Sequence, residues 1–442
     1  MPATSRPDAG PDNLRPGLQL EGGPPGTEED GLGYLDALGM HSVRLGLHRM
    51  ERALADLDRP DRRFPVLLVA GTNGKGSTSA LAASALQMAG YRVGLYTSPH
   101  LHRFAERVQI NGRPVGDEEL ADGVQTVRRV CTWQDDPAHQ DRLTYFELAT
   151  LLSMLCFARY EVDVAVVETG LGGQFDATAV LAPCVMAVTR IGLDHLEYFG
   201  TSLAEVARAE ASIFKPGVPV AVAPGQPSDA MEVLRTEAAR IGAPLSVCRE
   251  DYEGPLALRG AHQRQNAAVA NKALELLGPR GLSRAQDAVT CGFASTRWPG
   301  RFEDVAGVLL DVAHNPDGAQ ALAHGLRDHY PERPVELVFG VSTDKDYRGI
   351  LRILARSARH LHLCPPLTRR SLAPTACAAF ADEIGLPSSV YSSCTDALHA
   401  AQDSADSRGG LVCTTGSFNV VAEVRRLLLD SMAPPSSAAT PQ

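Results

Sequence analysis

The segment FPVLLVAGTNGKGSTSALAASALQMAGY, residues 64–91, decides the expected fold of the chain. Residues 64–70 are mostly apolar and predict a buried strand. A glycine-rich turn occupies 71–77, and an Ala- and Leu-rich stretch then predicts a helix up to Gly90. A strand, a glycine loop and a helix start form a phosphate cradle, because glycines let backbone N–H groups converge on an anion and the helix N-terminus adds free donors. We therefore expect a nucleotide site here.

The glycine loop supplies the candidate phosphate ligands Gly74, Lys75, Gly76 and Ser77. The lysine is placed to reach the terminal phosphates, and the serine hydroxyl suits a magnesium ion. The strict P-loop pattern G-x-x-x-x-G-K-[ST] is not matched, because Gly76 separates the lysine from the serine. On the loop alone, the alternative is an ordinary strand–helix turn with an exposed lysine.

Composition bounds the class of protein. At 442 residues, with 44% hydrophobic and 21% charged residues, the chain is typical of a globular protein with two or three domains. A net charge of −10 argues against nucleic acid or an anionic membrane as the main partner, but leaves room for a local basic pocket. The nine cysteines are scattered and predict reduced thiols rather than disulfides or a zinc site. Without a long apolar run or a signal peptide, we expect a cytoplasmic protein.

The order of the predicted elements indicates an α/β fold with two domains. Residues 1–30 and 431–442 are rich in small and polar residues and predict a disordered N-terminal arm and a disordered tail. Between them we expect a P-loop parallel-sheet ATP-binding domain at 31–297 and a smaller Rossmann-like C-terminal domain at 298–430. The segment STRWPGRFE, 295–303, predicts a hinge between them. In such sheets ligands bind beyond the carboxyl ends of strands.

The expected elements follow from apolar periodicity. In the first domain we expect strands at 64–70, 92–96, 162–168, 185–190 and 219–222 and helices at 44–57, 117–131, 144–160, 202–212 and 264–277. In the second we expect strands at 308–312, 335–340, 359–363 and 410–414, with helices that begin at 317 and 347 and a last helix at 417–430.

Polar side chains at strand ends predict a metal site. Glu168 ends the strand VDVAVVE and is followed by TGLGG, so it is placed to hold Mg²⁺ together with Ser77. The next strand leads to Asp194 and His195, and this histidine is a candidate ligand for a second ion that clamps the phosphate and its acceptor. The alternatives are a surface glutamate and a solvent-exposed loop histidine.

Further candidates follow other strands. Ser98, in YTSPHL, suits a metal or its water, or simply opens a Ser-Pro turn. Residues 144–147, TYFE, fit a helix capping box, and their aromatic pair can wall a flat ring. In the second domain Asp311 and His314 follow a strand, and Arg301 in the hinge can reach nucleotide phosphates. Turn chemistry is the alternative for this last group.

Taken together, these segments resemble the folylpolyglutamate synthase/dihydrofolate synthase family of the Mur ligase superfamily. The resemblance runs from about Tyr34 to Leu429. Cell-wall Mur ligases are expected to share the glycine loop but not the SPHL, ETGLGG and HNPDG segments. The motifs that carry the resemblance are VAGTNGKGSTSA (69–80), GLYTSPHLHRFAERVQINGRPV (94–115), LTYFELATLL (143–152), VVETGLGGQFDAT (166–178), IGLDHLEYFG (191–200), FKPGVP (214–219), HQRQNAAVA (262–270), WPGRFE (298–303), LDVAHNPDG (310–318), TDKDY (343–347) and TTGSFNVVAEVR (414–425).

The resemblance implies ATP-dependent amide ligation. A carboxylate of dihydropteroate or of a folate attacks the γ-phosphate of ATP and becomes an acyl phosphate, which the amino group of L-glutamate then attacks. ATP is then a co-substrate, and two Mg²⁺ ions are implied, with a monovalent cation as a further candidate. The partners implied are small-molecule substrates, with neither nucleic acid nor membrane, and the chain is expected to be a monomer.

Residue roles are implied position by position. Lys75, Glu168, His195 and Glu210 are implied in catalysis. The metal ligands are Ser77, Ser98 and Glu168 for the first ion and His195 for the second, with Glu210 as a hypothetical addition. ATP contacts are implied for Gly74, Lys75, Gly76, Ser77, Asn266, Arg301, Asp311 and His314. The substrate site comprises Thr144, Tyr145, Phe146, Glu147, Gln174, Phe175, Asp176 and Ala177.

The chain departs from the family pattern at one candidate metal ligand. The family usually has E-K-A-G-I before K-P-G, with a carbamylated lysine that helps to bridge the metals, and this chain has Glu210 at the lysine position. We hypothesise that Glu210 supplies an encoded carboxylate and removes the need for CO₂, with a water or a backbone shift making up for its shorter side chain. The alternative is a surface carboxylate and a weakened second metal site.

Two smaller departures concern substrate recognition. Gln174 replaces a common arginine and Ala179 a common asparagine, so the mode of carboxylate recognition stays open. Two other functions also stay open: a Mur-type ligase that extends a nucleotide-linked peptide, and a nucleotide-binding regulator without turnover. The sequence does not decide between dihydropteroate and folates, or how many glutamates are added.

Overall fold

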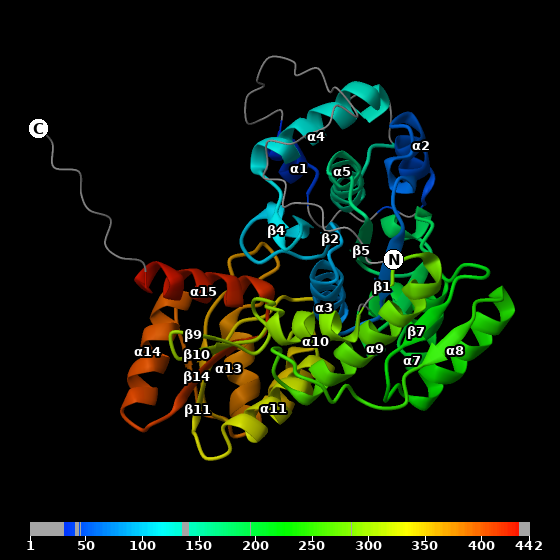
Figure 1. Ribbon diagram of the computed structural model, residues 1–442. Helices are drawn as coiled ribbons and strands as arrows, with labels where there is room; N and C mark the ends of the chain where they lie inside the picture. The colour runs from blue at the N-terminus through cyan, green and yellow to red at the C-terminus, as the bar shows by residue number, and fades with distance from the viewer. Residues whose placement is uncertain are drawn as a thin grey trace, which may run out of the picture. The chain divides into compact units, whose positions relative to one another are not determined.

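The chain folds into two compact units. The computed structural model describes residues 31–39, 44, 46–134, 141–194, 196–283 and 285–432, so the predictions for 1–30, for His195 and for 433–442 lie outside the described residues. The first unit comprises the described residues up to Ala257 together with Arg264–Thr296, and the second comprises Leu258–Gln263 and the residues from Arg297 onward (Figure 1).

The first unit is built on an eight-stranded sheet in the order β4-β3-β2-β5-β1-β6-β7-β8. Its strands β1, β2, β5, β6, β7 and β8 pair in parallel, whereas β3 and β4 join one edge in antiparallel fashion. The bounds are β1 (Val66–Ala70), β2 (Val93–Tyr96), β3 (Val108–Ile110), β4 (Arg113–Pro114), β5 (Val164–Glu168), β6 (Val185–Val188), β7 (Val220–Val222) and β8 (Leu245–Val247).

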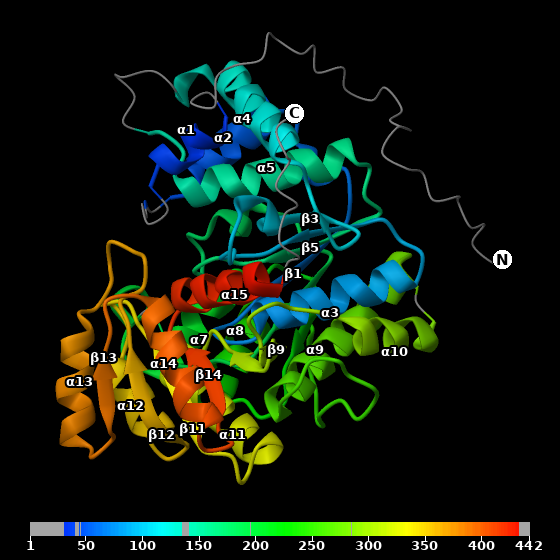
Figure 2. The same cartoon turned by 90° about the vertical axis from the view of Figure 1, so that its left-hand side faces the viewer.

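Helices cover both faces of this sheet, which explains why β1 is apolar at every position and fully buried. Helix α3 packs against β1, β2 and β5, and α10 packs against α3. Helices α1, α2, α4 and α5 gather around a separate apolar cluster (Figure 2). The bounds are α1 (Leu32–Ala37), α2 (His48–Asp56), α3 (Lys75–Met88), α4 (Asp117–Val130), α5 (Tyr145–Arg159), α6 (Leu196–Phe199), α7 (Leu203–Ala211), α8 (Ser228–Ile241), α9 (Ala261–Leu277) and α10 (Gln286–Ser295).

The second unit has a six-stranded sheet in the order β13-β12-β11-β14-β10-β9, parallel except for β9. Helices α11, α12 and α13 share one core with this sheet, while α14 and α15 pack on each other and on β11 and β14 respectively (Figure 2). The bounds are β9 (Glu303–Val305), β10 (Val308–Leu310), β11 (Val335–Phe339), β12 (Ala358–Leu363), β13 (Ser388–Val390), β14 (Leu411–Thr415), α11 (Pro316–His329), α12 (Tyr347–Leu354), α13 (Pro374–Glu383), α14 (Cys394–Asp406) and α15 (Phe418–Met432).

The predicted α/β class is confirmed, and the expected elements are present with bounds shifted by a few residues. Both sheets are mainly parallel, as predicted, and three short antiparallel strands that the sequence analysis did not predict, β3, β4 and β9, lie at their edges. These strands are only two or three residues long, too short to produce a periodic apolar pattern.

Across the described residues, none of the helices combines the length and the apolar character needed to cross a membrane.

The packing of α10 on α3 generates a stability prediction. A Cβ built on Gly292 would lie 2.6 Å from Ala85 Cα, a backbone atom of α3 that cannot move independently. We expect Gly292→Ala to lower the free energy of unfolding by about 1–3 kcal/mol through overpacking, measured by urea denaturation. The matched control is Gly278→Ala, because a Cβ there meets nothing within 4 Å. Equal stability of the two variants would contradict this account of the α3–α10 contact.

Candidate active site

The glycine loop after β1 has no space for side chains at two positions. Gly71 has φ +118° and Gly74 has φ +91°, conformations that residues other than glycine rarely adopt. A Cβ on Gly71 would lie 2.3 Å from Thr189 Oγ1, and a Cβ on Gly74 would lie 2.1 Å from Asn266 Oδ1. The second contact places Asn266, a predicted ATP ligand on α9, directly against the loop.

Hydrogen bonds hold the loop in one conformation. Lys75 Nζ donates to the carbonyl oxygens of Gly71 at 2.7 Å and of Thr72 at 3.3 Å. The N–H groups of Thr72 and Asn73 both donate to the carbonyl of Arg190, which follows β6. Because Lys75 is the first residue of α3, its ammonium group lies beside the helix N-terminus, where backbone donors favour anions.

Glu168 lies next to this loop, since β5 pairs with β1 and Glu168 is in register with Val69. Its side chain is buried, and Oε2 accepts a hydrogen bond from the Ser98 N–H at 3.1 Å. The structure therefore brings together two residues, Glu168 and Ser98, that were predicted as ligands of one metal. Ser77, in the first turn of α3, is buried as well.

Glu210 is a buried group and not the surface carboxylate of the alternative hypothesis. Only 1% of this residue, in the last turn of α7, is exposed. Its Oε2 accepts a hydrogen bond from the Gly71 N–H at 3.2 Å, and a Cβ on Gly172 would lie 2.6 Å from the same oxygen. Burial raises the pKa of Glu210 to about 7, although the Lys75 charge and the Gly71 hydrogen bond oppose the shift. The carboxylate thus lies between the glycine loop and the TGLGG segment.

Asp176 organises the TGLGG segment after β5. Its Oδ2 accepts hydrogen bonds from the backbone N–H groups of Gly170, Leu171 and Gly172 at 2.9–3.3 Å. Its Oδ1 accepts from the N–H and the hydroxyl of Thr178. All acceptor positions are thus used within the loop, so the main work of this predicted substrate residue is to shape the backbone.

A cavity of about 960 Å³ lies beside these segments in the first unit. Aromatic side chains from two parts of the chain line it: Phe146 on α5, Phe175 after β5, and Tyr198 and Phe199 on α6. Apolar walls with a few polar groups are typical of ligand pockets of this size. Most of the predicted substrate residues lie on its wall, together with Ser98, namely Thr144, Phe146, Glu147, Gln174, Phe175, Asp176 and Ala177.

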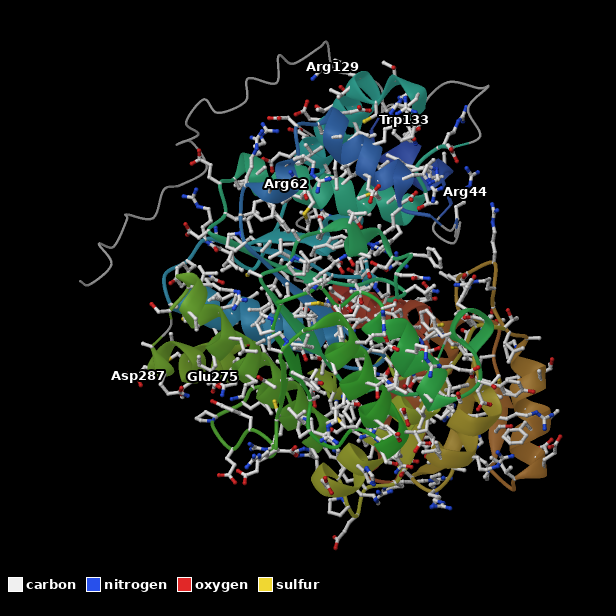
Figure 3. The ribbon with its side chains drawn as sticks, turned by 90° about the vertical axis from the view of Figure 1, so that its right-hand side faces the viewer. Arg44, Arg62, Arg129, Trp133, Glu275 and Asp287 are labelled. Atoms are coloured by element: carbon white, nitrogen blue, oxygen red, sulfur yellow. The ribbon has the colours of Figure 1, made fainter. Side chains whose placement is uncertain are left out.

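Two predicted substrate residues have structural partners. Tyr145 is not on the cavity wall but in the core that α5 shares with neighbouring helices. Glu147 forms the predicted capping box with Thr144, accepting from its N–H at 2.7 Å. It also forms a buried ion pair with Arg49 of α2 at 2.9 Å. Arg44, which Figure 3 labels, lies on the cavity wall and accepts from Arg49 through its carbonyl.

Arg107 is a cavity residue that the sequence analysis did not single out. Only 3% of it is exposed, and no carboxylate of the described residues lies within ion-pair distance. Its Nε donates to His100 Nδ1 at 2.9 Å, and its guanidinium lies over the Tyr145 ring at 5.3 Å. Burial first and Arg107 second lower the pKa of His100 to about 4, so the imidazole stays neutral and accepts this hydrogen bond. An uncompensated buried cation on a cavity wall attracts an anionic ligand.

In the second unit, two predicted ATP residues, Arg301 and His314, lie against the Phe418 ring, and a third, Asp311, is held by backbone donors. Asp311, just after β10, accepts from the N–H groups of Phe302 and Ala313, each at 2.9 Å. Burial raises the pKa of Asp311 to about 6, opposed mainly by Arg301. The Arg301 guanidinium lies 5.1 Å from the Phe418 ring centroid, and the His314 ring lies 5.5 Å from it.

The oxygen donors of the first unit fit a magnesium ion. Among the described residues no group of three or more His, Cys, Asp and Glu side chains forms a ready metal cage. Mg²⁺ does not need one, since it keeps several waters and binds through one or two carboxylates and substrate phosphates. Glu168, Ser77 and Glu210 are hard oxygen donors of this kind beside a phosphate loop. The contribution predicted for His195 lies outside the described residues.

Comparison with known proteins places the chain in a class and then in a family. Residues 69–241 match the Mur ligase middle domain, and residues 300–418 match the glutamate ligase domain of Mur ligases. The chain is therefore a Mur-type ligase, as its phosphate loop and its second α/β unit indicate.

Curated relatives identify the family within this class of ligases. The dihydrofolate synthase/folylpolyglutamate synthase of Bacillus subtilis is 34% identical over 87% of this chain and 95% of its own length. The chain belongs to the dihydrofolate synthase/folylpolyglutamate synthase family.

Solved structures of proteins with the same names have similar folds. Escherichia coli FolC in complex with DHPP and ADP has a TM-score of 0.81 and 31% identity, over 91% of this chain and 97% of that one. The bifunctional folylpolyglutamate synthase/dihydrofolate synthase of Yersinia pestis, complexed with AMPPNP and Mn, has a TM-score of 0.79 and 29% identity, over 90% and 97%.

The hydrogen bonds of Asp176 generate a prediction. An asparagine has only one oxygen, so Asp176→Asn leaves one of the two sets of donors without an acceptor. We expect the free energy of unfolding to fall by about 1.5–3 kcal/mol, measured by urea denaturation. Asp229→Asn on α8 is the control, because the exposed Asp229 side chain accepts a hydrogen bond from the neighbouring Ser228 hydroxyl and from no other group among the described residues. A stability loss no greater than that of the control would contradict the role given to Asp176.

Proposed function

We propose that this chain is an ATP-dependent ligase that joins L-glutamate to dihydropteroate, to the γ-carboxyl of a folate, or to both, through an acyl phosphate. One observation carries the proposal: the phosphate loop and the aromatic cavity share their dividing wall. Gly172 and Ala209 line the cavity, and Glu210, next to Ala209, accepts the hydrogen bond from Gly71 of the loop. An acceptor bound in the cavity therefore has a short path to a phosphate held by the loop.

The nucleotide end of the site rests on backbone donors. In the proposal the N–H groups of 74–77 and the Lys75 ammonium hold the β- and γ-phosphates, and Asn266 fixes the loop at Gly74. Lys75 leaves its carbonyl partners for the phosphates, which neutralises charge that develops as the phosphoryl group moves. Arg301, Asp311 and His314 of the second unit are proposed to contact ATP.

In the proposal, aromatic side chains and one buried arginine bind the acceptor substrate. Phe146 and Phe175 are proposed to lie against the flat pteridine ring, because both line the cavity. Arg107 is proposed to attract the acceptor carboxylate, since the cavity holds this guanidinium without a carboxylate partner among the described residues. Arg107 thus supplies a positive charge to a cavity in which position 174 carries an uncharged glutamine. Binding of both substrates thus places the acceptor carboxylate next to the γ-phosphate of ATP. Such positioning supplies the larger part of the rate enhancement in reactions of this kind.

A divalent ion fits the oxygen donors between the two ends. Ser77, Ser98 and Glu168 are proposed to hold a first Mg²⁺, and His195 with Glu210 a second. Such ions neutralise phosphate charge and orient the transferred group. The proposal includes two divalent ions, a monovalent cation beside them, and a monomeric chain.

We further propose that Glu210 takes the place of the carbamylated lysine of its relatives. Two observations support this: the carboxylate is buried, and it lies against both the glycine loop and the TGLGG segment, which directly follows Glu168. A buried carboxylate in this position needs a cation for compensation, and a bound metal supplies one. An encoded carboxylate makes the site independent of CO₂.

The proposed reaction predicts which substrates release phosphate. With ATP and Mg²⁺, we expect phosphate release only when L-glutamate is present together with dihydropteroate or tetrahydrofolate, with one ADP formed for each amide bond in a coupled assay. Lys75→Met should lower the rate at least about 100-fold, because it removes the charge beside the γ-phosphate. Turnover only with a nucleotide-linked peptide acceptor would instead indicate a cell-wall type of ligase. Nucleotide binding without turnover on any acceptor would indicate a regulator.

The role of Glu210 predicts the response to bicarbonate. The unmodified protein should have the same activity without CO₂ as it has after bicarbonate is added back. Glu210→Ala should lose about 10–100-fold in rate, and Glu210→Lys should gain activity as bicarbonate is added, because the lysine can then be carbamylated.

The matched control is Glu232→Ala, which removes an exposed carboxylate on α8 outside the cavity. We expect this variant to keep full activity at every bicarbonate concentration. Bicarbonate dependence of the unmodified protein, or full activity of Glu210→Ala, would show that Glu210 does not have the proposed role.

A further inference from the structure

One end of the cavity is formed by α7 and α8, which lie side by side (Figure 1). Positions 205, 208, 209 and 212 of α7 and its C-cap line it, and their spacing places them on one helix face. Glu237 and Arg240 of α8 also line it. None of these charged side chains has a role in the site described above.

The two glutamates at this end are already engaged. Glu205 accepts hydrogen bonds from the N–H groups of Thr201 and Ser202 and from the Ser202 hydroxyl, as part of the α7 capping box. These bonds lower its pKa and keep it ionised. Glu237 accepts from Arg240 Nε at 2.7 Å. Neither carboxylate therefore has a free role in binding a cation from solution.

The two arginines retain donors. An arginine carries five N–H donors in a planar fork that matches a carboxylate. Arg208 makes no hydrogen bond or ion pair within the described part of the chain, and its interaction with Glu205 is only a longer-range electrostatic one. Arg240 donates from Nε to Glu237, and its side chain, which lines the cavity, is 64% exposed. Arg208 and Arg240, called the rim below, therefore offer unused N–H donors to an anion, although Glu205 and Glu237 balance their charge.

We propose that Arg208 and Arg240 form a subsite for the additional carboxylates of a glutamylated acceptor. This inference rests on the proposed function and names part of its substrate. The cavity then has two anion positions, Arg107 within its buried wall and the Arg208–Arg240 rim at the α7–α8 end, with aromatic walls on the same cavity for the ring. Dihydropteroate has a single carboxylate, and each glutamate already present on a folate adds another. The rim therefore favours acceptors that carry several glutamates.

The test compares acceptors that differ in carboxylate number. In Arg208→Gln, Arg240→Gln and the double variant, KM is measured for dihydropteroate and for tetrahydrofolate with one and with three glutamates. We expect the ratio of KM for the triglutamate to KM for dihydropteroate to rise about three- to tenfold in each single variant and further in the double variant. Added salt should reduce this preference in the unmodified protein.

Arg235→Gln is the matched control, because Arg235 is an exposed arginine of α8 that does not line the cavity. The Arg235→Gln variant should leave all three KM values unchanged. An unchanged KM ratio in the double variant overturns the subsite. So does an equal rise for all acceptors, since that indicates a general effect on the cavity.

Calorimetric binding of pteroylmonoglutamate and pteroyltriglutamate separates this inference from the proposed function. If no acceptor is turned over, the proposed function fails, while tighter binding of the triglutamate that is lost in the double variant still supports the subsite. If the unmodified protein turns over dihydropteroate but binds both pteroylglutamates equally, the subsite fails and the function stands. If it binds neither pteroylglutamate, the subsite fails as well.

Discussion

The active site depends on one constraint, the fixed backbone of the loop between β1 and α3. Thr189 and Asn266 leave no space for side chains at Gly71 and Gly74, while the Glu210 carboxylate accepts the Gly71 N–H. Neighbouring strands contribute to the same position, because β5 and β6 flank β1 on either side. The loop geometry is therefore set by the glycine-rich motif together with three other segments of the chain, which carry Thr189, Glu210 and Asn266.

Much of this arrangement could be predicted from sequence. The apolar run before the glycines predicted β1, because a strand that is buried on both faces is apolar at every position. Glu168 was expected next to the loop because parallel strands place their carboxyl ends at one edge of the sheet, and its register with Val69 confirms that neighbourhood. The capping box of Thr144 and Glu147 is confirmed too, because a cap depends on residues three apart. These features are local, or follow from topology.

The features that sequence reasoning missed depend on contacts between distant residues. Arg49 pairs with Glu147 across 98 positions, which gives a predicted ligand a structural partner. Tyr145 was expected on the cavity wall, but the helix phase turns it into the core while its neighbour Phe146 lines the cavity. Arg107 stood inside a recognised motif, but its burial without a carboxylate partner among the described residues appears only in three dimensions. The roles assigned to the site residues stay predictions.

The shortest strand of the larger sheet has a consequence for the behaviour of the protein at high concentration. Strand β4 consists of Arg113 and Pro114, both exposed at the outer edge. An open strand edge invites pairing with another chain, but proline has no N–H to donate and arginine brings a charge that must stay hydrated. The proline and the charged arginine at the β4 edge of the eight-stranded sheet therefore disfavour its extension by a second copy of the chain.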